Sequence, residues 1–209
     1  MLNMTRTIGL ALVAAATSVA GAQATARVSV SPTSKLWIEG TSNVHDWKCE
    51  ATTIDAAIDI DPLAAQFPTG APKLLKKVVI KVPVKQMKCG HDKMDDNMYK
   101  ALKADQNAEI TYTMASFEAV GAEAKDDFTI RAVGQLSVAG AEQTLTMDVA
   151  AIRLPDGTIK ATGTVPIKMT AFGVKPPTAI FGTIRAGDEV KVRFELTMGP
   201  KVIALALKP

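Results

Sequence analysis

Alternation of apolar and polar residues with a period of two constrains the fold of this chain more than any other feature. It occurs in five segments, at residues 54–61, 77–85, 128–138, 144–149 and 190–196. Successive side chains of a β-strand point to opposite faces, so this period indicates strands with one buried face. A sixth segment, 110–117, is rich in β-branched and aromatic residues, which also favours a strand.

Turn residues separate these segments, at Gly121, at Ala139-Gly140 and at Pro155-Asp156-Gly157. Pro83 falls inside one expected strand, where it indicates an edge position, a bulge or an unpaired amide. Because helices do not alternate regularly with the strands, we expect an antiparallel sheet.

One stretch, residues 92–103, has helical spacing instead. It places Met94, Met98, Ala101 and Leu102 on one face. Asp95 or Asp96 would serve its N-terminus, and lysines suit its C-terminus. We predict a short helix there, and a weak second helix at residues 62–67.

The sheet predicts one all-β domain over residues 25–209, since no linker interrupts it. So many strands must close or stack to hide their edges. An up-and-down barrel and a β-sandwich both satisfy this requirement, and periodicity alone does not choose between them.

Residues 1–24 have the pattern of a secretory signal peptide. Arg6 precedes a short apolar run, and the segment ends in small residues that fit cleavage after Ala22 or Ala24. The run is shorter than the ~20 residues a membrane span needs. We therefore expect a periplasmic or secreted protein without a stable membrane span.

Two cysteines, Cys49 and Cys89, are present in an exported chain, where cysteines usually pair. A disulfide between them would close a loop of about 40 residues and contribute roughly 4 kcal/mol. The alternative is a metal or redox site, because His45, His91 and Met94 lie nearby in sequence and these residue types suit copper or zinc.

Composition excludes several functions. The net charge of +3, from 24 basic and 21 acidic residues, is too small and too evenly spread for nucleic-acid binding. No nucleophile–base pair is evident, so we expect neither an enzyme nor a cofactor. The acidic pairs Asp95-Asp96 and Asp126-Asp127 are interpreted as solvated charges.

The order of several motifs resembles the YceI-like family of exported, lipocalin-like barrels that bind polyisoprenoid lipids. The motifs that carry the likeness are LWIEGTSNVHDW at 36–47, the strand at 77–84 with HDKMDDNMYKAL at 91–102, AEITY at 108–112, GQLSVAGAEQTL at 134–145, AFGV at 171–174 and GTIRAGDEV at 182–190. His-Asp-Trp and Cys-Gly-His-Asp depart from the family pattern, and one cysteine lies at each departure, which supports their pairing.

The resemblance implies an antiparallel barrel of about eight strands, large enough to hold one ligand. Its cargo would be a polyisoprenoid or other long-chain lipid, bound without catalysis. The sequence is also compatible with a homodimer. Alternation then places apolar side chains in the lumen, and the resemblance adds Phe172 and the helix at 91–103 as elements of the mouth. The expected ligand-binding residues are Val78, Ile80, Val82, Tyr112, Met114, Ile130, Leu145, Met147, Phe172, Phe194 and Leu196.

Two other functions remain open at this level. One is a metal- or redox-handling protein using His45, Cys49, Cys89, His91 and Met94. The other is a structural β-sandwich module with a filled core and an exposed apolar patch.

Overall fold

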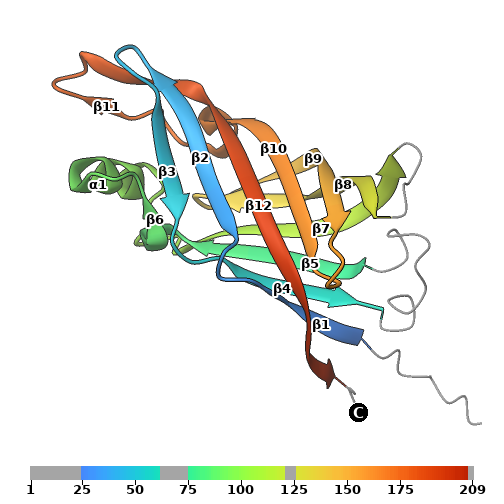
Figure 1. Cartoon of the computed structure of the whole chain (residues 1–209). Coiled ribbons are helices and arrows are strands. Elements are labelled where there is room, and N and C mark those ends of the chain that lie inside the picture. Colours follow the sequence, from blue (N-terminus) through green and yellow to red (C-terminus); the bar gives the residue numbers. More distant parts are fainter. Residues whose placement is uncertain (1–24, 62–74, 121–125, 207–209) are drawn as a thin grey trace, which may run out of the picture.

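The structure, a computed structural model, describes residues 25–61, 75–120 and 126–206. The predicted signal peptide, the weak helix at 62–67 and the turn at Gly121 lie outside these residues. The described part is mostly strand, with one α-helix and two short 3₁₀ helices (Figure 1). Its elements are β1 (Thr25–Val30), β2 (Lys35–Ser42), β3 (Trp47–Ala51), β4 (Asp55–Ile60), β5 (Leu75–Pro83), η3 (Val84–Gln86), β6 (Met87–Lys88), α1 (Asp92–Ala101), β7 (Glu109–Val120), β8 (Asp127–Val138), β9 (Ala141–Arg153), β10 (Ile159–Lys168), η4 (Met169–Phe172), β11 (Thr178–Ala179) and β12 (Ile184–Ala206).

Eight antiparallel strands close into a barrel in the order β1–β4–β5–β7–β8–β9–β10–β12. The pairing of β1 with β12 completes the ring. A closed ring leaves no free edge among these strands, which is how a sheet of this size avoids edge-to-edge association. The fold is therefore the predicted lipocalin-like barrel, and the sandwich alternative is wrong.

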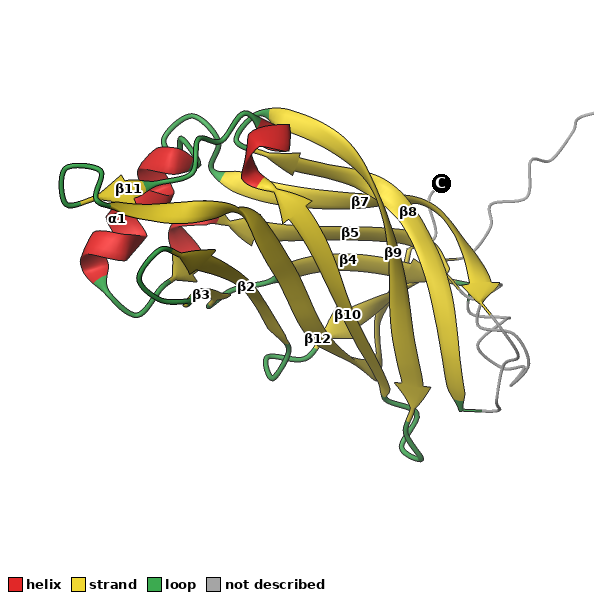
Figure 2. Ribbon diagram, turned by 90° about the horizontal axis from the view of Figure 1, so that it is seen from above, coloured by secondary structure: helices red, strands yellow, loops and turns green. Residues whose placement is uncertain are grey.

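The long strand β12 pairs with two strands, one after the other, along one of its edges. Its first half, from Ala186 to Glu195, pairs with β2, and its second half, from Met198 on, pairs with β1. Beyond β2, the strands β3 and β6 extend the wall at one end of the barrel. The same end carries α1, η4 and β11, as Figure 2 shows from above. We call it the α1 end.

Turn chemistry follows the sequence prediction. Ala139 and Gly140 both have positive φ, 53° and 84°, and they join β8 to β9 in the tight hairpin that such a pair of angles permits. Residues 155–157 form the turn between β9 and β10, where the Thr158 amide donates to the Asp156 carboxylate at 2.9 Å.

Pro83 does not mark an edge strand, because β5 lies between β4 and β7. Pro83 is the last residue of β5 and pairs with Glu109 of β7. On the other side, β4 begins at Asp55, opposite Lys81, so no residue of β4 lies opposite Pro83. The missing amide hydrogen of proline therefore costs no bond to β4, and the chain continues into η3.

Tight packing is concentrated at the α1 end. One cluster of buried residues contains Cys49, Val82, Met87 and Met98, and a second contains Leu136, Val138, Ala139, Phe172 and Val174. Met98, on the apolar face of α1, is the helix's contribution to the first cluster and is 9% exposed. The helix thus covers one end of the barrel.

An apolar cavity along the barrel

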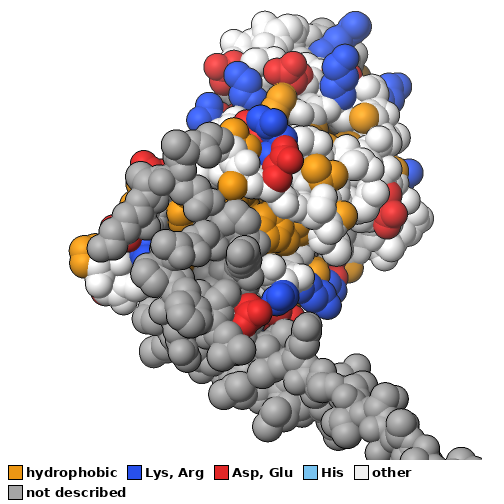
Figure 3. Space-filling model, turned by 90° about the vertical axis from the view of Figure 1, so that its right-hand side faces the viewer, with side chains coloured by type: hydrophobic (Ala, Val, Ile, Leu, Met, Phe, Trp, Pro, Cys, Tyr) orange, Lys and Arg blue, Asp and Glu red, His pale blue; other side chains and the backbone are white. Residues whose placement is uncertain are grey.

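The barrel encloses a cavity of about 770 Å³. This volume lies within the range of roughly 300–1,000 Å³ that small-molecule sites occupy. Its lining reaches from Ser42, Met94 and Thr178 at the α1 end to Val28, Ile60 and Met198 toward the opposite end. Figure 3 views that opposite end and shows hydrophobic side chains exposed among polar and charged ones. The cavity therefore follows the barrel rather than forming a local pit.

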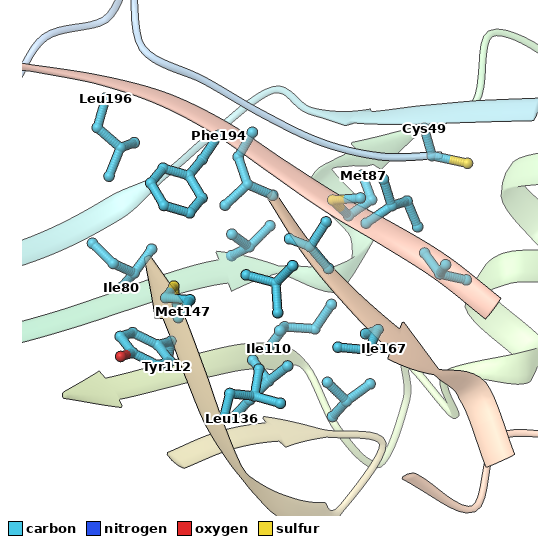
Figure 4. Close-up of a pocket in the computed structure, with 18 of the residues that line it drawn as sticks. Cys49, Ile80, Met87, Ile110, Tyr112, Leu136, Met147, Ile167, Phe194 and Leu196 are labelled. Carbon is cyan, nitrogen blue, oxygen red and sulfur yellow. The ribbon is translucent and has the colours of Figure 1, made fainter. Parts of the chain in front are cut away.

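Every residue predicted from sequence as a lumen residue lines this cavity. The eleven are Val78, Ile80, Val82, Tyr112, Met114, Ile130, Leu145, Met147, Phe172, Phe194 and Leu196. Figure 4 shows side chains from strands on different sides of the barrel pointing into the shared space. Their contact with a ligand stays a prediction.

The register of the sheet explains why alternation identified them. Ile80 of β5 lies opposite Tyr112 of β7, and Tyr112 lies opposite Leu136 of β8. Residues directly opposite each other in an antiparallel pair share a face. One inward residue on each strand therefore places its partners inward as well.

Two glycines provide room for aromatic rings against the wall. A Cβ atom added at Gly163 would lie 2.4 Å from Cζ of Phe194, and one added at Gly134 would lie 2.6 Å from the Tyr112 ring. Real Cβ atoms do not approach other atoms so closely. Because glycine lacks a Cβ, both rings occupy space that another residue's side chain would take.

Tyr112 brings a polar group into the apolar wall. Its hydroxyl oxygen is buried and has no hydrogen-bond partner among the described residues. Burial raises the pKa of this phenol above its usual value, so the hydroxyl stays protonated at physiological pH. It can therefore donate a hydrogen bond to a ligand oxygen.

Charge is scarce on the lining. Within the described part of the chain, Arg153 is its only permanently charged side chain, and no carboxylate contributes. Arg153 lies at the end of β9, away from α1, and none of the ion pairs formed by the described residues includes it. Such an interior suits an apolar chain with at most a small polar or anionic end.

The Cys49–Cys89 disulfide is present and joins β3 to the segment before α1, with the two Cα atoms 3.9 Å apart. The Cys89 sulfur lies 3.8 Å from the sulfur of Met98 on the helix. The Tyr99 hydroxyl lies 2.8 Å from the carbonyl oxygen of Met87. These contacts hold α1 against the end of the cavity.

Asp95 corrects one sequence interpretation, since it is not a solvated charge but is 5% exposed. Its carboxylate accepts a hydrogen bond from the Cys89 amide at 2.7 Å and pairs with Lys88 at 3.1 Å. Burial raises the pKa of Asp95, but the Cys89 amide and Lys88 together outweigh it and hold the pKa below its usual value. Asp95 thus fastens α1 to the disulfide-bonded segment. Asp96, Asp126 and Asp127 are exposed, as expected.

The two histidines make local contacts. The His91 side chain caps α1 by accepting from the Lys93 amide at 3.2 Å. Asp95 lies in the first turn of the helix, as the sequence interpretation allowed. His45 lies in the loop between β2 and β3, lines the cavity, and its amide donates to Ser42 Oγ at 3.1 Å. Both cysteine sulfurs are in the disulfide. Across the described ranges, no group of three or more His, Cys, Asp or Glu residues could hold a metal ion.

Sequence reasoning missed part of the wall. Strand β10 contributes Ala161, Val165 and Ile167, whose alternation with polar residues could have identified it. All seven methionines after residue 24 also line the cavity, at Met87, Met94, Met98, Met114, Met147, Met169 and Met198. Alternation predicted Met114 and Met147, and helical spacing placed Met94 and Met98 on one face, whereas Met87, Met169 and Met198 were found only in the tertiary structure. Methionine is flexible and polarizable, so this lining can adapt to ligands of different shape.

A closed up-and-down barrel with an apolar interior defines a lipocalin-like protein. The model of the YceI-like domain matches residues 19–198, and the chain belongs to this family. No curated protein matches the sequence significantly.

Solved structures show the same fold. BcnA of Burkholderia cenocepacia has a TM-score of 0.62 at 20% identity, over 81% of this chain and 99% of that one. A polyisoprenoid binding domain from Saccharophagus degradans, implicated in plant cell wall breakdown, has a TM-score of 0.60 at 14% identity, over 83% and 97% of the two chains. The YCEI protein of Campylobacter jejuni has a TM-score of 0.52 at 18% identity, over 71% and 82%.

Proposed function

We propose that this protein is an exported, non-catalytic carrier that holds a long-chain lipid of the polyisoprenoid class inside its barrel. The observation that carries the proposal is the continuous cavity of about 770 Å³ with an almost wholly apolar lining. Membership of the YceI-like family and the likeness to a polyisoprenoid binding domain support it.

The physical reason is the transfer of apolar surface from water. Each buried methylene contributes about 0.8 kcal/mol, so a chain of several five-carbon units has a strong driving force to enter the barrel. No chemical step is needed for this role. Placement outside the cytoplasm is supported by the signal-peptide pattern and by a disulfide, which persists in oxidising compartments.

Two groups would orient the cargo. The buried Tyr112 hydroxyl would donate to an oxygen of the lipid, and Arg153 would attract a small polar or anionic end at the opposite end of the barrel from α1. A lipid that combines a hydrocarbon chain with an oxygen-bearing group would satisfy both.

Native mass spectrometry of gently purified protein, followed by organic extraction, tests the proposal. Adjacent residues on β9 supply a matched pair of variants. Ala151 lines the cavity and Ala150 faces outward. We expect a lipid with repeating five-carbon units to copurify with the wild type and with Ala150→Phe, and much less of it with Ala151→Phe. An apo mass for the wild type, with no extractable lipid, would contradict the proposal.

A further inference from the structure

Three large hydrophobic side chains are exposed on two loops at the α1 end. Phe181 is fully exposed and Ile180 is 65% exposed, both in the turn between β11 and β12. Val44, in the loop between β2 and β3, is 62% exposed. We call Val44, Ile180 and Phe181 the apolar tip. Among the described residues, Ile152 is the one other large hydrophobic side chain with comparable exposure.

Asn43 holds the two loops together. Its side-chain nitrogen donates to the Thr183 carbonyl at 2.8 Å, and its side-chain oxygen accepts from the Arg185 amide at 2.8 Å. The Asn43 amide donates to the Arg185 carbonyl at 3.2 Å. Figure 1 shows both loops at the same end of the barrel. The two loops that carry the three apolar side chains are therefore joined by hydrogen bonds.

The backbone of the tip is strained in a way that points to function. Ile180 and Phe181 have φ values of 48° and 53°, a region that suits Gly or Asn and disfavours β-branched and bulky residues. Hydrogen bonds from the Gly182 amide to the Ala179 carbonyl and from the Thr183 hydroxyl to the Ile180 carbonyl keep the turn closed. Solvent exposure and backbone conformation would both favour polar residues here, yet the chain presents apolar ones. Such conflicts are typical of binding surfaces.

The charges beside the tip are mostly positive. From residue 171 to residue 187 the only charged side chains are Lys175 and Arg185. The next two residues are acidic, but Asp188 accepts hydrogen bonds from the Thr170 amide and hydroxyl, and Glu189 lies opposite Lys168 on β10. Asp46 is the one carboxylate in the other loop. Arg185 is exposed and donates from Nε to the Gly182 carbonyl at 2.9 Å, which keeps its charge beside the turn. Apolar side chains flanked by cations complement an anionic lipid surface.

The tip also adjoins the cavity. Thr178 and Ala179 before the turn, and Ile184 and Ala186 after it, all line the interior. We propose that the apolar tip inserts into the headgroup region of an anionic bilayer and sets the α1 end of the barrel against the membrane. A lipid could then pass between bilayer and cavity along apolar surface. This docking goes beyond the proposed carrier function and does not require its cargo to be known.

Vesicle flotation of the exported protein tests the proposal, with its N-terminus checked by intact mass. The vesicles contain phosphatidylethanolamine with phosphatidylglycerol, or phosphatidylcholine alone. We expect binding to the first and little to the second. Phe181→Asn removes the ring at a position whose φ suits Asn, so the turn is preserved, and binding should fall roughly tenfold or more. Ile152→Thr, at an exposed apolar position on β9, is the matched control and should bind as the wild type does.

Lys175→Gln separates the charge contribution, since it should weaken binding about fivefold and only to the anionic vesicles. The proposal is overturned if the wild type stays unbound with both vesicle types, or if Ile152→Thr reduces binding as much as Phe181→Asn. It is also overturned if Phe181→Asn converts a dimer to a monomer in light scattering without changing flotation, because the tip would then contact a second copy. Lipid recovered by extraction is measured on the same samples, so failure of docking is distinguishable from failure of the carrier proposal.

Discussion

Replacing Gly163 by alanine should force the Phe194 ring off the barrel wall. The two residues are directly opposite each other on β10 and β12. An added Cβ would lie 2.4 Å from the ring, about 1 Å less than the 3.4 Å at which ordinary contacts begin. Because the wall lies behind the ring, the ring must move toward the lumen.

The expected magnitude follows from two opposing effects. Overpacking of this kind costs typically 1–3 kcal/mol. Removing a strand glycine returns about 0.5–1 kcal/mol through backbone entropy. We therefore expect Gly163→Ala to lower the free energy of unfolding by about 1–2 kcal/mol and to reduce lipid retention.

A double-mutant cycle with Phe194→Leu identifies the clash as the cause. The smaller side chain leaves room for the new Cβ, so the double variant should be more stable than the sum of the single effects by about 1–2 kcal/mol. Urea unfolding followed by circular dichroism measures each free energy. Gly199→Ala is the control, since Gly199 is also a cavity-lining strand glycine but an added Cβ there meets nothing within 4 Å. Additivity within 0.5 kcal/mol, or equal effects at Gly163 and Gly199, would refute the reasoning.

Three further predictions concern the disulfide, Asp95 and Tyr112. Replacing Cys49 and Cys89 together by serine opens a loop with a sequence separation of 40 and should cost about 4 kcal/mol in urea unfolding; a loss below 1 kcal/mol would show that the bond does not constrain the unfolded chain. The lowered pKa of Asp95 means that the stability contributed by its carboxylate is present above pH ~4 and is lost as the pH falls through the folded-state pKa. Asp95→Asn should lower the free energy of unfolding by about 1–2 kcal/mol at pH 7 and reduce the loss of stability on the acid side of the pH profile. An unchanged loss of stability on the acid side would show that other carboxylates cause it. Tyr112→Phe removes an unpartnered buried hydroxyl, so it should stabilise the apo protein by about 1 kcal/mol in thermal unfolding while weakening an oxygen-bearing lipid roughly tenfold; equal affinity of both proteins for that lipid would exclude the hydrogen bond.

Strand alternation predicted the lumen because the property it reports is local. On β5, Val78, Ile80 and Val82 share a face whatever the strand pairs with, since side chains alternate by geometry alone. The helix predicted at 92–103 from the same kind of local spacing is present as α1, Asp92–Ala101, and Met94 and Met98 lie on its cavity side.

Properties that depend on neighbours in space were not accessible in this way. Asp95 looks like an exposed helix residue until Lys88 and the Cys89 amide are placed beside it. Gly163 looks like a weak point in a strand until Phe194 lies across it. In both cases the role of the residue depends on a partner from another element of the fold: β6 and the segment after it for Asp95, and β12 for Gly163.

By itself, the sequence determined six of the strands, the helix, the tight hairpin at residues 139–140 and which side chains of those strands face inward, because each follows from backbone geometry over a few residues. Periodicity alone left the barrel and the sandwich open, and the resemblance to the YceI-like family chose the barrel that the structure confirms. Only the tertiary structure decided that the lumen stays hollow and that the loops of Val44 and Phe181 meet at one end. Closure is set by the pairing of β1 with β12, whose residues are far apart in the chain. Hydrophobic periodicity shows that a face is buried, but only long-range pairing fixes what that face encloses.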